Sequence, residues 1–303
     1  MAQQTGVENE AFRHETNLRK LELAVTRKLD GFLHGENLTT RHGPGSERGE
    51  GRVYQPGDDA RRIDWSVTAR MNELHVRDTI ADRELETWLV VDGTASLDFG
   101  TRKWEKRDLA LTAAGAFGLL GARAGNRVGA LIYDSDGVNV LPPKGGRKSV
   151  MQVLRRLDRR PRGTAPSADL SEALATVRRT ARRRGRVVVI SDFIDTGDWP
   201  AELRRLGLKQ DVIVASITDP RELELPPSGL ISFVDPESGD LVEIQTSNKK
   251  FRRRFAAEAQ ARADARRDAI HKSGARHVEL STDRDWMLDL VAFVNRTGRT
   301  GLR

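Results

Sequence analysis

Residues 88–96 read Trp-Leu-Val-Val-Asp-Gly-Thr-Ala-Ser, an apolar run that ends in a carboxylate and two hydroxyls. The apolar run predicts a buried strand, and Asp92, Thr94 and Ser96 follow it at alternate positions. Alternate side chains of an extended segment share a face, so these three oxygens are expected to converge. Open α/β sheets bind ligands at the carboxyl ends of their strands. Hard oxygen ligands of this kind suit Mg²⁺ or Mn²⁺, so the stretch predicts a metal site on an α/β fold.

The length and composition exclude several classes of protein. The chain has 303 residues, enough for one large domain or two small ones. It contains no cysteine, which excludes disulfides and thiolate metal sites. No apolar run reaches transmembrane length, and the polar N-terminus lacks the apolar core of a signal peptide. We therefore expect a cytoplasmic protein without a transmembrane segment.

The positive net charge raises nucleic-acid binding as an alternative function. Basic residues number 51 against 44 acidic ones, which gives a formal net charge of +7. The densest basic clusters, at 178–184 and 252–254, fall in helical patterns, which favours a solvated helix face. No aromatic side chains alternate with these clusters, and no zinc pattern is present. We therefore expect no nucleic-acid partner.

From about residue 85 the apolar pattern alternates between strands and helices, which predicts a doubly wound, mostly parallel sheet. The expected strands are 86–92, 127–133, 137–141, 186–191, 211–217 and 276–280. The expected helices are 103–123, 146–157, 169–184, 200–206, 248–273 and 284–296. The strand at 137–141 follows its predecessor so closely that it should form an antiparallel hairpin at the edge. A second hairpin is predicted at Leu230–Val234 and Leu241–Gln245.

The chain divides into three parts. Residues 1–83 are expected to form an extension with a helix at 17–33, a glycine-rich loop at 35–52 and the segment 52–70. Residues 84–296 form the α/β domain, and residues 297–303 are a tail.

Two further polar positions follow elements of the same sheet. Thr164 lies in the loop before the helix at 169–184, and Asp192 ends the apolar strand at 186–191. Both should lie at the same sheet edge as Asp92, because parallel strands place their carboxyl ends together. Two carboxylates in one cleft would repel each other without a cation, which supports a metal here.

This set resembles the metal-ion-dependent adhesion site of the von Willebrand factor A fold, with its Asp-x-Ser-x-Ser motif, a Thr and an Asp. Thr94 stands where that family has Ser, and it keeps the hydroxyl. The resemblance implies that Asp92, Thr94 and Ser96 bind Mg²⁺ directly or through water, that Thr164 ligates only when a partner is bound, and that Asp192 acts through water. An acidic side chain of the partner fills the open position, which implies protein recognition rather than catalysis.

Residues 52–70 read Arg-Val-Tyr-Gln-Pro-Gly-Asp-Asp-Ala-Arg-Arg-Ile-Asp-Trp-Ser-Val-Thr-Ala-Arg. They resemble the signature of the DUF58 family, and the resemblance extends over about 17–295. It implies an adaptor for a MoxR-type AAA+ ATPase in protein complex assembly or remodelling. The positions that form the signature are Tyr54, Pro56, Gly57, Asp58, Asp59, Arg61, Asp64, Trp65 and Arg70.

The signature segment has two interpretations. Pro56-Gly57 suits a type II turn, and Trp65 is expected to be packed. The segment either connects the N-terminal helix to the α/β domain or forms a partner-binding surface.

An enzymatic alternative comes from the sequence Val91-Asp92-Gly93-Thr94, which is similar to the Asp-x-Asp-Gly-Thr motif of haloacid dehalogenase phosphatases. That motif needs a nucleophilic Asp two residues before its second Asp. Val90 stands there and cannot attack a phosphoryl group. We therefore expect a protein that is not an enzyme.

Overall fold

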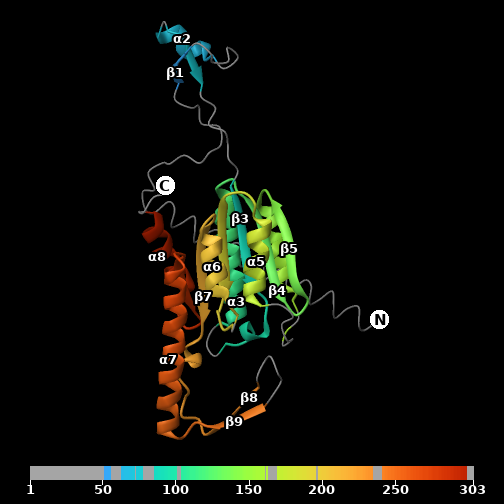
Figure 1. Ribbon diagram of the computed structural model, residues 1–303, viewed down its shortest axis with the longest axis vertical. Coiled ribbons are helices and arrows are strands. Elements are labelled where there is room, and N and C mark those ends of the chain that lie inside the picture. Colours follow the sequence, from blue (N-terminus) through green and yellow to red (C-terminus); the bar gives the residue numbers. More distant parts are fainter. Residues whose placement is uncertain are drawn as a thin grey trace, which may run out of the picture. The chain divides into compact units, whose positions relative to one another are not determined.

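The described residues form two compact units. The computed structural model describes residues 51–55, 63–71, 73–77, 85–100, 104–160, 162, 169–195, 197–234 and 241–298. One unit lies within Leu38–Glu84, and the described residues from Leu85 onward form the other. The second unit contains a six-stranded sheet with helices on both faces (Figure 1). The predicted α/β, doubly wound, mostly parallel fold is therefore confirmed.

The sheet has the strand order β10-β7-β6-β3-β4-β5. Its strands are β3 (Glu86–Asp92), β4 (Arg127–Asp134), β5 (Gly137–Lys144), β6 (Gly185–Ser191), β7 (Asp211–Thr218) and β10 (Arg276–Ser281). Every neighbouring pair is parallel except β4 with β5, which is the predicted antiparallel edge hairpin. β5 continues past the predicted end through Pro142 and Pro143. An edge strand tolerates proline because its outer side pairs with no neighbour.

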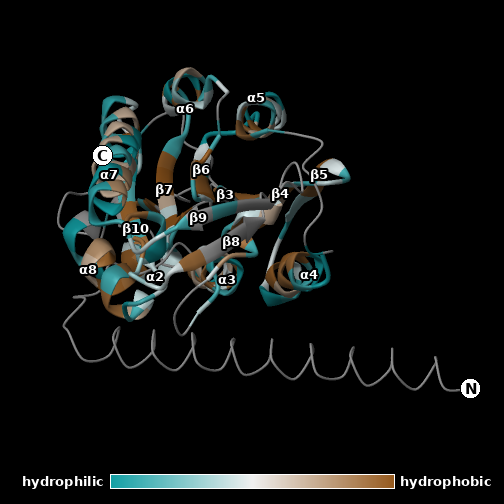
Figure 2. Ribbon diagram, turned by 90° about the horizontal axis from the view of Figure 1, so that it is seen from below, coloured by the Kyte–Doolittle hydropathy of each residue, from teal (hydrophilic) through white to brown (hydrophobic). Residues whose placement is uncertain are grey.

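Helices cover both faces of the sheet, as Figure 2 shows. One face packs against α3 (Lys106–Arg123), α4 (Arg147–Asp158) and α8 (Trp286–Gly298). The other packs against α5 (Leu170–Thr180), α6 (Trp199–Gly207) and the C-terminal part of α7 (Lys249–Lys272).

α5 ends at Thr180 rather than at the predicted residue 184. The side chain of Gln210 explains the early end, because its amide nitrogen donates to the carbonyl oxygens of Ala181 and Arg183 at 2.9 Å. Its amide oxygen accepts from the backbone N–H of Gly185 at 2.8 Å. These contacts satisfy the backbone groups of the turn into β6, so the helix need not continue.

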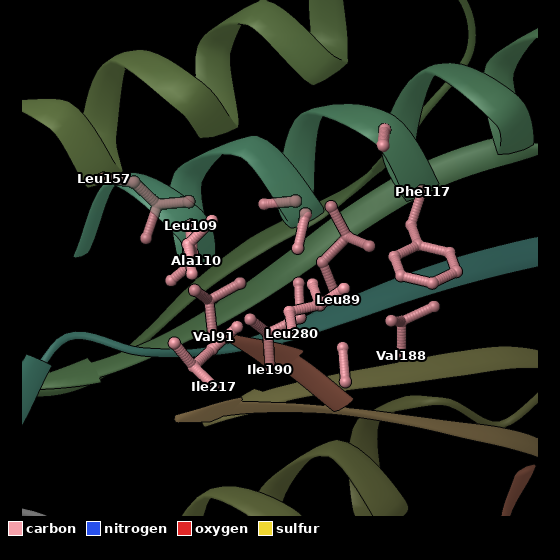
Figure 3. Close-up of a cluster of buried hydrophobic side chains, with 14 of the residues drawn as sticks. Leu89, Val91, Leu109, Ala110, Phe117, Leu157, Val188, Ile190, Ile217 and Leu280 are labelled. Carbon is pink, nitrogen blue, oxygen red and sulfur yellow. The ribbon is translucent and has the colours of Figure 1, made fainter. Parts of the chain in front are cut away.

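The central strand β3 is buried on both faces. Leu89 and Val91 have no exposed surface and pack in the core below α3, where Figure 3 shows them near Leu109 and Ile190. Trp88 and Val90 belong to the core on the opposite face. A strand covered on both sides is apolar at every position, which is why the sequence reads as a continuous apolar run.

The smaller unit contains an antiparallel pair, β1 (Gly51–Val53) with β2 (His75–Arg77), and the helix α2 (Trp65–Met71). The prediction of a loop over 35–52 was wrong at its C-terminal end, because Gly51 and Arg52 belong to β1 and pair with β2. The rest of that loop and the predicted helix at 17–33 lie outside the described residues. The hairpin of β8 (Leu230–Val234) and β9 (Leu241–Gln245) is confirmed. None of the helices in the described part combines the length and apolar character needed to cross a bilayer.

The absence of a side chain at Gly185 allows β6 to lie close to the backbone of β3. A Cβ at this position would lie 2.1 Å from the backbone oxygen of Glu86. We predict that Gly185→Ala lowers the free energy of unfolding by about 3 kcal/mol in urea denaturation, because the backbone must shift.

Gly145→Ala is the matched control for this substitution. A Cβ at Gly145 would meet no atom within 4 Å, so its effect should stay within about 1 kcal/mol. Equal destabilisation by the two variants would contradict the described pairing of β3 with β6.

Candidate functional site

The sheet reverses its direction of growth between β3 and β6. The chain passes from β3 to β4 on one side and later returns to place β6 on the other side of β3. Loops that leave two such strands diverge, and the crevice between them is where open α/β sheets bind ligands. Asp92 is the last residue of β3, and Asp192 directly follows β6. The topology therefore brings both carboxylates to this crevice.

Three side-chain oxygens form a connected cluster after β3. Thr94 Oγ1 donates to Asp92 Oδ1 at 2.7 Å and lies 2.9 Å from Ser96 Oγ. The backbone N–H of Thr94 also donates to Asp92 Oδ1, at 2.8 Å. Asp92 is buried, whereas Thr94 and Ser96 keep part of their surface exposed. The cluster thus joins a buried carboxylate to two hydroxyls of partly exposed residues.

Side chains from the neighbouring strands β6 and β4 orient the Asp92 carboxylate. Ser191 Oγ donates to Asp92 Oδ2 at 2.7 Å and accepts from the Tyr133 hydroxyl at 3.1 Å. Burial raises the pKa of Asp92, and the nearby charge of Asp192 raises it further, against hydrogen bonds from Thr94 and Ser191. Burial also raises the pKa of Tyr133 well above its usual value, with Asp92 as the next cause. Burial and Asp192 therefore disfavour the ionised form of Asp92, while the Arg160 guanidinium is a nearby positive charge that acts on it.

Asp192 has a counter-ion that the sequence analysis missed. The Lys106 ammonium, at the first residue of α3, donates to Asp192 Oδ2 at 2.7 Å and also to Glu222 Oε1. Lys106 is 1% exposed. Burial acts to lower the pKa of Lys106, but the two carboxylates outweigh it and the pKa is raised. Burial acts to raise the pKa of Asp192, but Lys106 holds it below the usual value.

This ion pair changes one argument made from the sequence. Two carboxylates in the crevice were expected to need a metal, yet Lys106 already compensates Asp192. The need for a cation therefore rests on Asp92. In the part of the chain that the structure describes, no three acidic or imidazole groups gather to hold a metal ion. A metal at Asp92 would depend on the hydroxyls of Thr94 and Ser96.

Arginine side chains fix the loop that carries the cluster. Arg160 is buried and donates to the Gly93 carbonyl oxygen at 2.8 Å and to Asp98 Oδ1 at 2.8 Å. Arg107 donates to the carbonyl oxygens of Asp158 and Arg160 at 2.7 and 3.0 Å. The loop after β3 is therefore held to the end of α4, which limits its freedom to rearrange.

The structure places the predicted site residues as follows. Asp92, Thr94, Ser96 and Asp192 come together, because Asp192 acts electrostatically on Asp92 and accepts a hydrogen bond from Ser96. Thr164 lies outside the described residues. So do five signature positions, namely Pro56, Gly57, Asp58, Asp59 and Arg61.

The described signature residues belong to the smaller unit. Asp64 caps α2, because its Oδ1 accepts from the Ser66 hydroxyl at 2.6 Å and from the backbone N–H groups of Ser66 and Val67. The expected packing of Trp65 was wrong. Its side chain is 69% exposed because it starts a seven-residue helix with no buried residue. Tyr54 is half-buried and donates its backbone N–H to Leu74, and Arg70 is exposed.

A periodic signal could have identified Lys106. It precedes the buried Leu109, Ala110, Ala113 and Phe117 at helical spacing, so a lysine occupies the core-facing stripe of α3. A weaker sequence signal pointed to Glu222. Asp219 and Glu222 follow the apolar strand β7 with the three-residue spacing of a capping box.

A cavity of about 250 Å³ adjoins the ion pair. Asp192 and Glu222 line one part of it, and His277 of β10 and Arg266 of α7 line another. His277 Nε2 lies 2.8 Å from Ser216 Oγ. Burial lowers the pKa of His277 to about 4, and His271 and Arg267 lower it against the opposing charge of Glu279.

Residues 50–265 match the family described as "Protein of unknown function DUF58". The chain belongs to the DUF58 family. An "uncharacterized protein" of Mycobacterium tuberculosis is 48% identical over 287 residues, which cover 94% of this chain and 90% of the relative. A shorter one from Mycobacterium avium is 37% identical over 164 residues, which cover 54% of this chain and 96% of that protein.

Solved structures with a similar arrangement include a conserved hypothetical protein BatB from Bacteroides thetaiotaomicron. Its TM-score is 0.45 at 12% identity, with 71% of this chain and 99% of that chain covered. A von Willebrand factor type A structure from Catenulispora acidiphila has a TM-score of 0.35 at 14% identity, with 75% and 43% covered.

The lowered pKa of His277 predicts a pH dependence of stability. The folded state favours the neutral ring, so this contribution is present above the unfolded pKa of 6.5 and is lost as the pH falls towards about 4. Between about pH 7 and about pH 5, urea denaturation should show a smaller loss of unfolding free energy for His277→Gln than for the wild type. Identical losses in both proteins would contradict a buried neutral His277.

Proposed function

We propose that this protein is a metal-dependent protein-interaction module. Asp92, Thr94 and Ser96 would hold Mg²⁺ or Mn²⁺ at the end of β3. The bound ion would supply a positive centre with open coordination positions, one of which takes a carboxylate of the partner. The observation that carries this proposal is the spacing of the three oxygens, 2.7 and 2.9 Å along the cluster.

The spacing fits an octahedral ion. Mg²⁺ binds oxygen at about 2.0–2.1 Å, so neighbouring ligands of an octahedron lie about 2.9 Å apart. The separations from Thr94 Oγ1 to Asp92 Oδ1 and to Ser96 Oγ are already close to this value. The burial of Asp92, which disfavours its ionised form, supports a cation in the same place. One carboxylate with two hydroxyls leaves several positions for water and for a partner.

The protein's own groups prepare the site for binding. Ser191 fixes the second oxygen of Asp92, and Arg160 fixes the carbonyl of Gly93. Thr94 and Ser96 are partly exposed, which supports access of a partner to this end of β3. Thr164 would join only in the partner-bound state, and Asp192 would act through water, as the family resemblance implies.

For the partners we propose a MoxR-type AAA+ ATPase, which would supply the carboxylate that binds the metal, and an acidic client or partner protein. The protein would then act as an adaptor in the assembly or remodelling of protein complexes. A phosphatase activity is disfavoured, because Val90 is a fully buried apolar residue where the nucleophile would be required. We therefore propose recognition without catalysis.

The metal site is tested by thermal unfolding with increasing Mg²⁺ or Mn²⁺ against a chelator. Saturation to about a hundred times the dissociation constant adds about 2.7 kcal/mol, which should raise Tm by about 5–10 °C. Asp92→Asn should abolish the shift, because an amide is a poor ligand for Mg²⁺.

Asp136→Asn is the matched control for the metal titration. Its side chain is an exposed carboxylate in the turn after β4, at the same sheet edge, and it should leave the shift unchanged. The metal proposal fails if Asp92→Asn retains the full shift of the wild type.

The recognition step is tested by binding to a MoxR-type ATPase from the same organism. Fluorescence anisotropy should show binding in Mg²⁺ that is lost in chelator and in Asp92→Asn, and that persists in Asp136→Asn. The physical reason is that the partner carboxylate binds to the metal rather than to the protein surface. Equal binding in chelator would show that metal is not the recognition element.

A further inference from the structure

Lys106 is a buried cation at an unfavourable place for positive charge. It is the first residue of α3, where the positive end of the helix dipole disfavours an ammonium. Its Nζ lies 2.7 Å from Asp192 Oδ2, contacts Glu222, and is 5.9 Å from the centre of the Phe99 ring. These contacts offset the cost of burial and fix the ammonium beside the oxygen cluster.

The two aspartates of the crevice differ in their partners. Asp192 already binds donors through both oxygens, because Oδ2 accepts from Lys106 and Oδ1 accepts from the Ile194 N–H at 3.0 Å. Among the described residues, no ammonium or guanidinium donates a hydrogen bond to Asp92, whose donors are neutral groups of Ser191, Thr94 and Tyr133. The two carboxylates are therefore not equivalent as metal ligands.

The formal charges of the groups in the crevice agree with this difference between Asp92 and Asp192. Asp92, Asp192 and Glu222 contribute three negative charges, and Lys106 contributes one positive charge. The three carboxylates therefore exceed the ammonium by two charges, and the Arg160 guanidinium, which pairs with Asp98, also acts electrostatically on Asp92. Lys106 therefore leaves room for a metal at Asp92 while it occupies Asp192.

We infer that the Lys106 ammonium is a built-in cation that binds Asp192 and so prevents it from coordinating the metal. This inference rests on the proposed metal site at Asp92. In the free protein, Asp92, Thr94 and Ser96 are the direct protein ligands, and the ammonium holds Asp192 away from direct coordination, so that Asp192 reaches the metal only through water. The withheld ligand keeps metal affinity low and leaves more coordination positions for a partner's carboxylate. Lys106 is thus a positioning residue, which acts on the metal through Asp192.

The test is a double-mutant cycle on Mn²⁺ affinity, measured from free Mn²⁺ by electron paramagnetic resonance. Lys106→Met removes the charge with little change in length, and Asp192→Asn removes the carboxylate. Lys106→Met should tighten Mn²⁺ binding about tenfold, because Asp192 becomes available as a ligand. In the Asp192→Asn background, the same substitution should tighten binding by less than about threefold.

The cycle separates this mechanism from simple charge removal. Loss of a positive charge near any cation site strengthens binding, and that effect is similar in both backgrounds. Equal tightening by Lys106→Met in the wild-type and Asp192→Asn backgrounds would overturn the inference and leave the metal site intact. No tightening by Lys106→Met would overturn it as well. Absence of Mn²⁺ binding in all four proteins would overturn the proposed metal site itself.

Two further variants keep the test valid if Lys106→Met does not fold. Lys106→Gln keeps an amide that can donate to the carboxylates without a charge, and it replaces Lys106→Met in the same cycle. Lys106→Arg keeps the positive charge and should not tighten Mn²⁺ binding. Tightening by Lys106→Arg equal to that of the neutral variants would contradict the role of the ammonium charge.

Discussion

The parallel pairing of β3 with β6 is the constraint on which the site depends. Both strands are apolar on both faces, so they are placed at the centre of the sheet between two layers of helices. Their register aligns Val91 with Ile190, which puts Asp92 and Asp192 at neighbouring carboxyl ends. Two carboxylates in a dry crevice cost free energy unless positive charge is supplied. The fold meets this cost differently for each of them.

Asp192 receives its positive charge from the chain itself. The Lys106 ammonium links the start of α3 to the ends of β6 and β7 through Asp192 and Glu222. In the described part of the chain, the hydrogen bonds to Asp92 come from neutral groups, among them Thr94 and Ser191, and burial and Asp192 raise its pKa. A protein that compensates one carboxylate and leaves the other short of charge has an asymmetric site, and a cation from solution would correct the asymmetry.

Most of the fold was predictable from the sequence because its central strands are continuous apolar runs and its helices have clear apolar stripes. The strands and the edge hairpin were placed correctly for this reason. The end of α5 was missed because a side chain from the turn before β7, Gln210, satisfies the backbone there. The strands of the smaller unit were missed because each is three residues long, too short for a periodic signal.

The candidate site was predictable only in part. Alternation along the chain identified Asp92, Thr94 and Ser96, and the parallel sheet added Asp192. Lys106 was not recognised because a charged residue at a helix start is usually solvated, and only long-range packing shows that it is buried. The prediction for Trp65 was wrong in the opposite sense, because its aromatic side chain was expected to be packed and is exposed. Local patterns identify neighbouring polar side chains at the end of one strand, but not a counter-ion that belongs to another element.

The most direct measurement is anomalous diffraction from crystals of the protein soaked in Mn²⁺. The account predicts an anomalous peak about 2 Å from Asp92 Oδ1, Thr94 Oγ1 and Ser96 Oγ, with the Lys106 ammonium still in contact with Asp192. A peak at another position, or no peak at this cluster in crystals where the loop is open to solvent, would contradict the central claim that Asp92 anchors a metal.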